Sequence, residues 1–377
     1  MKIQGKYNCA EIFNDSVEEK CMQQIYNLLN IPVFADSQIS IMPDVHLGKG
    51  VVIGFTMQLN DFICPSVVGC DIGCGVLGFN LGKIEVDLKE FDSFVRGQIP
   101  SGKMVREKIE EKHLISIKKH LLPLIEKIDS KKEERFLKSI GTLGGGNHFI
   151  ELNKDMEGNL WLVSHTGSRS LGLAVYNYYS RKSKKYVKEK FKGAGAYYGM
   201  EFLPMNGGGQ EYLEDMHTAQ EYAALNRFVI SQILIEGFFK IRLNKCESIE
   251  SVHNYINLND RIIRKGAIAA HKGQKVIIPL NMRDGTAIGT GKGNPRWNYS
   301  ACHGSGRRLS RIQAKKEISL NEFHQCMHGI YSTSIGIKTI DESPMAYKPS
   351  NEILTLVKEA VDIQHIMKPI YNFKDSQ

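Results

Sequence analysis

The segment Ser300–Arg307, which reads S-A-C-H-G-S-G-R, places a histidine beside two glycines and an arginine. An imidazole can attack phosphorus as a nitrogen nucleophile or act as a general base, and both roles stay open for His303. The guanidinium of Arg307 can hold two phosphate oxygens, and glycine lets the backbone approach an anion closely. The segment indicates phosphoryl or nucleotidyl transfer. A structural histidine in a glycine turn before a helix is the non-catalytic interpretation.

Further short segments combine glycine with histidine, cysteine or acidic residues. Each one lies at the end of an apolar run, where strands deliver side chains to a shared cleft. These segments are Asp44–Gly50, Gly69–Gly75, Gly144–Glu151, Ser164–Arg169 and Val252–Asn254. Taken alone each is a weak signal, but together they predict one composite site.

The candidate ligands for one or two divalent ions are Cys74, His148, His165 and His253. Asp71, three positions before Cys74, is able to bridge them. Thiolate and imidazole favour zinc, whereas a carboxylate bridge and phosphate substrates also admit manganese or magnesium. Paired ions could orient a triphosphate for in-line displacement. For any one of these histidines a structural role is the simpler interpretation, but it does not explain the whole set.

The composition is that of a globular protein. Of its 377 residues, 42% are hydrophobic and 24% are charged. No apolar run approaches the roughly 18 residues of a membrane span, and the polar N-terminus lacks a signal-peptide core, so we expect a cytoplasmic protein with no membrane association. The eight cysteines are scattered, which fits a reducing compartment. Cys70 and Cys74 do not form a C-x-x-C pair, so no zinc ribbon is expected.

A formal net charge of +8 suggests a polyanionic partner. Seven basic residues and one acid lie between Ser180 and Lys192, with tyrosines on both sides at positions 176, 178, 179, 197 and 198. Basic side chains neutralise phosphates and aromatic rings stack on unpaired bases, so this segment could bind single-stranded nucleic acid. A solvated, lysine-rich helix face is the alternative.

Hydrophobic periodicity predicts the elements that must position these residues. Helices are expected over about Ser16–Asn30, Met104–Lys132, Glu211–Lys240 and Asn351–Asp362. Strands are expected at Ile39–Met42, Val51–Leu59, Val67–Val68 and Val76–Leu81, around Ser251, and from Gly266 to Pro279. Because motifs occur on both sides of the helix at 211–240, one shared site would exclude independently folding domains. The glycine-rich stretch Met205–Gly209 is then a loop and not a linker.

The motifs resemble those of the RtcB family of GTP-dependent RNA ligases, which join RNA 3′-phosphate or 2′,3′-cyclic phosphate ends to 5′-hydroxyl ends. They occur in the family order and span most of the chain. The matching stretches are Met42–Gly54, Asp71–Gly75, Gly144–Glu151, His165–Arg169, His253–Asn254, Arg264–Ala267 and His303–Arg307.

This resemblance implies a mixed α/β (α+β) fold, with residues 1–377 forming a single compact domain of central β-sheets and peripheral helices. It implies that Asp71, Cys74, His148, His165 and His253 bind two Mn²⁺ ions and that His303 becomes guanylylated. It also implies a set of GTP contacts, in which Lys374 corresponds to the family's closing lysine. The implied contacts are Asn147, His148, Phe149, Ile150, Glu151, His253, Asn254, Pro279, Met282, His303, Gly304, Ser305, Gly306, Arg307 and Lys374.

Two departures from the family pattern suggest a shorter, divergent bacterial paralogue. The family usually has I-P-G-S-M-G where this chain reads I-P-L-N-M-R-D-G at residues 278–285, and Cys302 replaces the usual alanine. We expect the altered loop Leu280–Asp284 to affect the choice of nucleotide or RNA, with Arg283 as a candidate phosphate contact.

The leading prediction is an RNA ligase acting in RNA repair or tRNA splicing, whose protein partners the sequence does not identify. A metal-dependent RNA phosphodiesterase or cyclic-phosphate hydrolase without a covalent GMP step is the enzymatic alternative. Non-catalytic RNA binding is the third, and the complete set of ligands with a nucleophile disfavours it.

Overall fold

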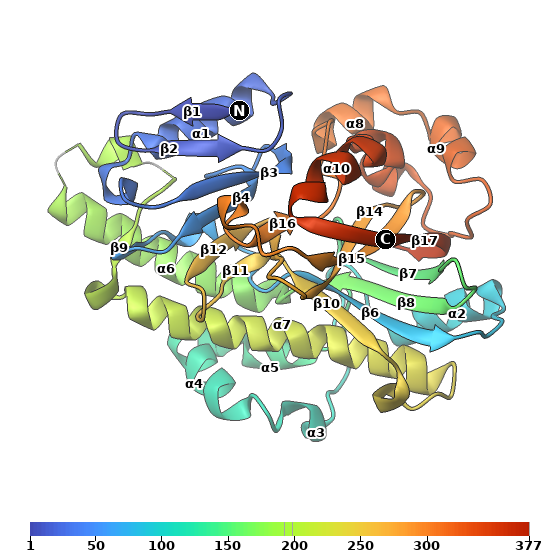
Figure 1. The fold of residues 1–377 in the computed structure, drawn as a ribbon. Helices are drawn as coiled ribbons and strands as arrows, with labels where there is room; N and C mark the ends of the chain where they lie inside the picture. The colour runs from blue at the N-terminus through green and yellow to red at the C-terminus, as the bar shows by residue number, and fades with distance from the viewer. Residues whose placement is uncertain (192, 198, 377) are drawn as a thin grey trace.

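Two large sheets form the centre of the molecule (Figure 1). The computed structural model describes residues 1–191, 193–197 and 199–376. The first sheet has six strands, in the order β1 (Lys2–Gln4), β2 (Cys9–Ile12), β3 (Ile39–His46), β4 (Ile53–Gln58), β12 (Ile262–Lys265) and β11 (Asn254–Ile256). The second has seven, in the order β10 (Ser248–Val252), β6 (Gly75–Gly82), β8 (Leu160–Thr166), β7 (Phe149–Lys154), β17 (Val361–Phe373), β15 (Gly285–Gly291) and β14 (Lys275–Asn281).

Two short ribbons complete the strands. β13 (Ala267–Ala269) pairs with β16 (Ser300–Cys302), and β5 (Phe62–Ile63) pairs with β9 (Leu203–Pro204). Helices surround the sheets in Figure 1. They are α1 (Glu19–Leu29), α2 (Leu88–Gln98), α3 (Glu111–Leu114), α4 (Lys118–Asp129), α5 (Glu133–Lys138), α6 (Arg169–Lys190), α7 (Gly209–Gly237), α8 (Arg311–Glu317), α9 (Leu320–Cys326) and α10 (Ser350–Leu356).

The long helix α7 joins the two halves of the fold. It contacts β6 and β8 of the second sheet and β11 of the first, and α4 and α6 pack against it. Apolar side chains of α7 such as Met216 and Ala219 lie in the core of the first sheet, while Ile230 and Leu234 lie in that of the second. One helix therefore contributes to both apolar cores, which fixes the sheets relative to each other.

The expected α/β fold with central sheets and peripheral helices is confirmed, and several predicted elements are found. The predicted helix at 16–30 is α1, that at 211–240 is α7, and strands β3, β4, β6, β10 and β13–β14 match the predicted runs. Met205–Gly207 forms a 3-10 turn between β9 and α7, as expected of a loop. Within the described residues, no helix combines the length and apolarity needed to cross a bilayer.

Three predictions of secondary structure were wrong. Val67–Val68 is not a strand: Pro65–Val67 forms a 3-10 turn, which the fixed φ of Pro65 favours. The helix expected over 104–132 is broken into α3 and α4, and Met104–Glu110 is not helical. The last helix ends at Leu356 and continues only as a 3-10 turn to Glu359, after which Asp362 belongs to β17, a strand that the sequence did not reveal.

Candidate active site

Four neighbouring strands of the second sheet bring the candidate metal ligands to one edge. β6 begins directly after Cys74, β7 begins directly after His148, β8 carries His165 near its end, and β10 ends just before His253. The register places Gly75 opposite both Val252 and Thr166, and Phe149 opposite His165. Because adjacent strands run antiparallel, starts and ends alternate along this edge, and all four ligands meet there.

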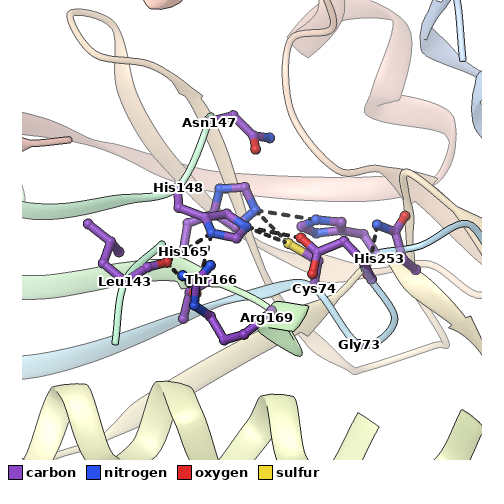
Figure 2. A network of polar contacts seen from close by, with 12 residues as sticks. Gly73, Cys74, Leu143, Asn147, His148, His165, Thr166, Arg169 and His253 are labelled. Atoms are coloured by element: carbon purple, nitrogen blue, oxygen red, sulfur yellow. Dashed lines mark hydrogen bonds and ion pairs between the residues drawn. The ribbon is translucent and has the colours of Figure 1, made fainter. Parts of the chain in front are cut away.

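Cys74 lies at the middle of the cluster (Figure 2). Its Sγ is 3.5 Å from His148 Nε2 and 3.3 Å from His165 Nε2. Beyond these, His148 Nε2 is 3.0 Å from Asp71 Oδ2, and His165 Nε2 is 3.3 Å from His253 Nε2. The five predicted ligands therefore lie together, and Cys74, His148 and His165 are close enough to hold a metal ion.

The protonation of His148 favours a cation in this cluster. Its Nδ1 lies 2.9 Å from the carbonyl oxygen of Leu143, so Nδ1 carries the hydrogen and donates it. Nε2 then faces Oδ2 of Asp71 at 3.0 Å and the Cys74 sulfur at 3.5 Å. A lone pair on Nε2 and the Asp71 carboxylate are both acceptors, so this contact needs a positive charge between them, either a proton or a metal ion. A histidine whose second nitrogen donates to a carbonyl is the usual arrangement of a metal ligand.

Burial gives the ligands unusual acidities. It raises the pKa of the Cys74 thiol well above its ordinary value, with Asp71 adding to the effect, and it lowers the pKa values of His165 and His253 well below theirs. Burial acts to raise the pKa of Asp71, but the hydrogen bond and charge of His148 lower it. The imidazoles of His165 and His253 are thus neutral and able to coordinate, and a bound cation would reverse the effect of burial on the thiol.

Two buried polar residues of α7 position the loops that carry these ligands. Nη1 of Arg227 donates to the carbonyl oxygens of Gly73 and Thr166, at 2.7 and 3.0 Å. These two residues are the chain neighbours of Cys74 and His165. The Asn226 amide donates to the carbonyl oxygen of Gly167 at 3.1 Å. A Cβ at Gly167 would lie 2.2 Å from Oδ1 of Asp71, so a larger residue there would displace this carboxylate.

His303 lies beside the metal cluster, at the end of β16. Its ring centroid is 4.9 Å from that of His253. Nδ1 of His303 is 2.6 Å from Oδ2 of Asp44, a fully buried carboxylate that also accepts the backbone N–H of His303 at 3.2 Å. A carboxylate on Nδ1 fixes the tautomer in which Nε2 is unprotonated. Nε2 is therefore the atom able to act as nucleophile or base.

A cavity of about 490 Å³ opens in front of His303. Most of the residues predicted to contact GTP line it: Asn147, Phe149, Glu151, Pro279, Met282, His303, Gly304, Ser305, Gly306, Arg307 and Lys374. His148, Ile150, His253 and Asn254 do not line it. The side chain of Ile150 lies in the apolar core, because alternate residues of β7 face opposite sides of the sheet. The Asn254 amide instead bonds the backbone of Asp71 and Gly266, at 3.2 and 2.9 Å.

Glu151 is the buried acid of this cavity. Its carboxylate accepts hydrogen bonds from the amides of Asn153 and Asn372, each at 2.8 Å. Burial nevertheless raises the pKa of Glu151 to about 7. A carboxylate at this position can accept the N–H groups of a purine, and its charge state changes near neutral pH.

A group of cations shares a second buried acid, Glu342. Nη1 of Arg311 is 2.6 Å from Oε1 of Glu342, and Nη1 of Arg307 and Nζ of Lys374 are each 3.4 Å from that carboxylate. Burial opposes ionisation of Glu342, but these cations, Lys374 foremost, lower its pKa to about 2. Arg311 also pairs with the buried Asp341 at 2.6 Å, so three cations face two carboxylates, and the positive charge that remains suits phosphate oxygens.

The divergent loop Leu280–Asp284 forms part of the cavity wall, but not through its charged residues. Leu280 is 3% exposed; it lines the cavity and also packs in the apolar core behind it. The Asn281 side chain accepts the backbone N–H groups of Arg283 and Asp284 at 3.0 and 2.9 Å and so closes the turn. Arg283 pairs with Asp284 at 2.8 Å and does not line the cavity. The structure therefore gives no support to Arg283 as a phosphate contact.

Several residues of the site were missed from the sequence. Asp44 and His46 lie in a motif that had been singled out, but no role was derived for either. His46 lines the cavity, its Nδ1 is 2.8 Å from the carbonyl oxygen of Asp44, and burial lowers its pKa to about 4. Glu342 and Tyr347 reach the cavity from a 3-10 turn and a loop that carry no motif, so only the tertiary structure identifies them.

Comparisons with known proteins agree with this geometry. Residues 24–375 match the family described as tRNA-splicing ligase RtcB. The chain is 30% identical to the RNA-splicing ligase RtcB of Escherichia coli K12, with 94% of each chain covered, so shortness does not distinguish it from that relative. It is 27% identical to the tRNA-splicing ligase RtcB of Thermococcus kodakarensis, covering 96% of this chain and 92% of the relative. It is 29% identical to the RNA-splicing ligase RtcB homolog 2 of Entamoeba dispar, covering 95% and 87%.

Proposed function

The chain belongs to the RtcB family of RNA ligases, and on that premise we propose that it joins RNA 3′-phosphate or 2′,3′-cyclic phosphate ends to 5′-hydroxyl ends with GTP and two Mn²⁺ ions. The observation that carries the proposal is the pairing of His303 with Asp44 beside the cluster centred on Cys74. A buried carboxylate on one ring nitrogen and an open cavity at the other are what a nitrogen nucleophile requires.

In the first step, the lone pair of His303 Nε2 attacks the α-phosphorus of GTP. The new nitrogen–phosphorus bond forms as the bond to the β-phosphate oxygen breaks, and pyrophosphate leaves. Asp44 holds the ring and stabilises the positive charge that develops on it. Arg307, Arg311 and Lys374 place positive charge near the phosphates, and Glu151 accepts the N–H groups of guanine.

Asp71, Cys74 and His148 would hold one ion, and Cys74, His165 and His253 the other. Bound ions would neutralise phosphate charge and polarise the reacting oxygens. The identity of the ions as manganese follows from family membership, since the donor atoms by themselves also suit zinc. The RNA acted on, in repair or in tRNA splicing, is part of this proposal, as is a cytoplasmic location, which the eight unpaired cysteines support.

The test is incubation with GTP labelled at the α-phosphate and Mn²⁺, followed by denaturing separation. The wild-type protein should carry an acid-labile label, and His303→Ala should carry none. His217→Ala is the matched control, since this histidine is 48% exposed and pairs with Glu221 on α7. Sealing of RNA pairs that differ only in a 3′-phosphate or a 3′-hydroxyl should then require the phosphate. Opening of a cyclic phosphate by a wild-type protein that never takes up label would instead establish the hydrolase alternative.

A further inference from the structure

Helix α6 leads from the active site to the molecular surface. It begins at Arg169, four residues after the ligand His165. It then passes the rim of the cavity, where the Lys49 ammonium, which lines the cavity, lies 5.6 Å from the ring centroid of Tyr176 on α6. At 1.5 Å per residue, the remaining stretch to Lys190 extends about 20 Å beyond that point. An RNA chain whose end occupies the cavity could follow this helix outward.

The basic residues of α6 separate into two sets. Lys182 faces the body of the protein, because its Nζ is 2.7 Å from Oε2 of Glu211 and lies over the ring of Tyr178. The other set is exposed, and within it Arg181, Lys184, Lys185 and Lys188 follow the spacing i, i+3, i+4, i+7 and therefore share one side of the helix, whereas Lys190, at the end of the helix, does not follow this spacing. All four are exposed. We call these four residues the basic face.

The basic face has almost no compensating charge. Its one ion pair in the described part of the chain joins Lys185 to Glu189 at 3.9 Å, and Arg181, Lys184 and Lys188 have none there. Its members repel each other at i,i+3 and i,i+4, a spacing at which like charges destabilise a helix. Such repulsion is relieved when an external polyanion lies along the helix.

Most of the tyrosines around this segment pack against other aromatic side chains. Tyr179 is buried and donates to Asp215 at 2.5 Å, and the ring of Tyr178 packs edge-on against that of Tyr179. Tyr197 packs against Phe191 and Phe202, and Tyr198 lies outside the described residues. Burial therefore rules out base stacking for Tyr179, whereas Tyr176, Tyr178 and Tyr197 are half-buried and their stacking stays a prediction. What remains exposed is charge, which recognises the backbone and not the sequence of a nucleic acid.

We propose that the basic face binds the backbone phosphates of the RNA substrate beyond the end that enters the cavity. This inference rests on the proposed function, because it takes RNA as the substrate. The face holds the body of the RNA irrespective of base sequence, while the cavity reads the chemistry of the end. It should therefore matter for long RNAs and not for short ones that fill only the cavity.

The test replaces Arg181, Lys184, Lys185 and Lys188 together with glutamine. A matched control replaces four exposed lysines that have no ion-pair partner within the described residues and lie outside α6: Lys119, Lys131, Lys272 and Lys358. Both variants lower the net charge by the same amount. Binding of a long and a short 3′-phosphate RNA is measured by fluorescence anisotropy over a range of salt, and guanylylation by GTP is measured alongside.

For the variant of the basic face, the salt dependence of long-RNA binding should become shallower by about 2 to 3 in log–log slope, since each phosphate contact to a single strand contributes about 0.7. Short-RNA binding and guanylylation should stay within about twofold of wild type. Unchanged long-RNA binding, or equal losses in both variants, would overturn the proposal and leave the face as a solvated surface. Because binding is measured without sealing, a protein that binds long RNA through this face but takes up no GMP would refute the proposed function and not this inference.

Discussion

Replacement of Asp44 by asparagine tests how His303 is prepared for attack. The carboxylate accepts Nδ1–H of His303 at 2.6 Å and is fully buried, so the bond is charge-assisted and shielded from water. Asparagine has nearly the same shape, but it is neutral and can present an N–H to Nδ1. In that orientation the ring hydrogen moves to Nε2, and the nucleophilic lone pair is lost.

The expected loss in guanylylation rate follows from the strength of the hydrogen bond between Asp44 and His303. A hydrogen bond to a charged group contributes about 1.5–3 kcal/mol. If that contribution only selects the tautomer and orients the ring, guanylylation should slow by about 10- to 150-fold, because about 1.4 kcal/mol corresponds to a factor of ten. If the amide also reverses the tautomer, the loss should approach the roughly 10⁴-fold seen for the same change in a Ser-His-Asp triad.

The assay is single-turnover labelling of Asp44→Asn with GTP and Mn²⁺, with thermal unfolding to confirm the fold. Asp92→Asn is the control, because Asp92 is also a buried carboxylate, paired with Arg96 at 3.0 Å but remote from His303 in its contacts. The control should lose stability and keep its labelling rate. A rate for Asp44→Asn within about threefold of wild type would show that Asp44 does not set the state of His303.

Four further predictions concern the metal, the nucleotide, the pH dependence of stability and the divergent loop. Cys74→Ala should lower metal content and guanylylation together, because a methyl group cannot replace a thiolate ligand. The control Cys246→Ala, which removes a partly exposed thiol outside the site, should change neither. Unchanged metal content in Cys74→Ala would show that Cys74 is only a buried thiol. GTP should bind more weakly as the pH falls through about 7, where Glu151 becomes protonated, and Glu151→Gln should remove this dependence. The pKa of Glu151 in the folded protein lies above the ordinary 4.5. The free energy of unfolding of the nucleotide-free protein should therefore fall as the pH rises from 4.5 to about 7, because the buried carboxyl loses its proton over this range. Thermal melts over this pH range would measure the change. The double variant Leu280→Gly, Asn281→Ser should lower the free energy of unfolding by about 2–5 kcal/mol, since Leu280 is a core side chain, and its main effect should be on stability and not on RNA choice. A double variant with full stability and an altered choice of RNA would contradict this prediction.

The sequence by itself was enough to predict which residues come together in one site. Ligand-type residues beside glycine at the ends of apolar runs predicted one shared site, and the structure brings Asp71, Cys74, His148, His165 and His253 together as expected. The spacing of apolar residues also predicted α1 and α7. These features are local, because a turn, a helix face or a ligand type is encoded within a few residues.

Only the tertiary structure decided how the site is supported and where its boundaries lie. Asp44 and His303 are separated by 259 positions, and Glu342 and Tyr347 reach the cavity from segments without any motif. The strand β17 and the buried Arg227 were not foreseen, and Tyr179 proved to be a core residue instead of a stacking platform. Pairing across such distances depends on strand register and helix packing, which involve the whole chain. A charged or aromatic side chain has the same letter in the sequence whether it faces solvent or the core, and only packing determines which.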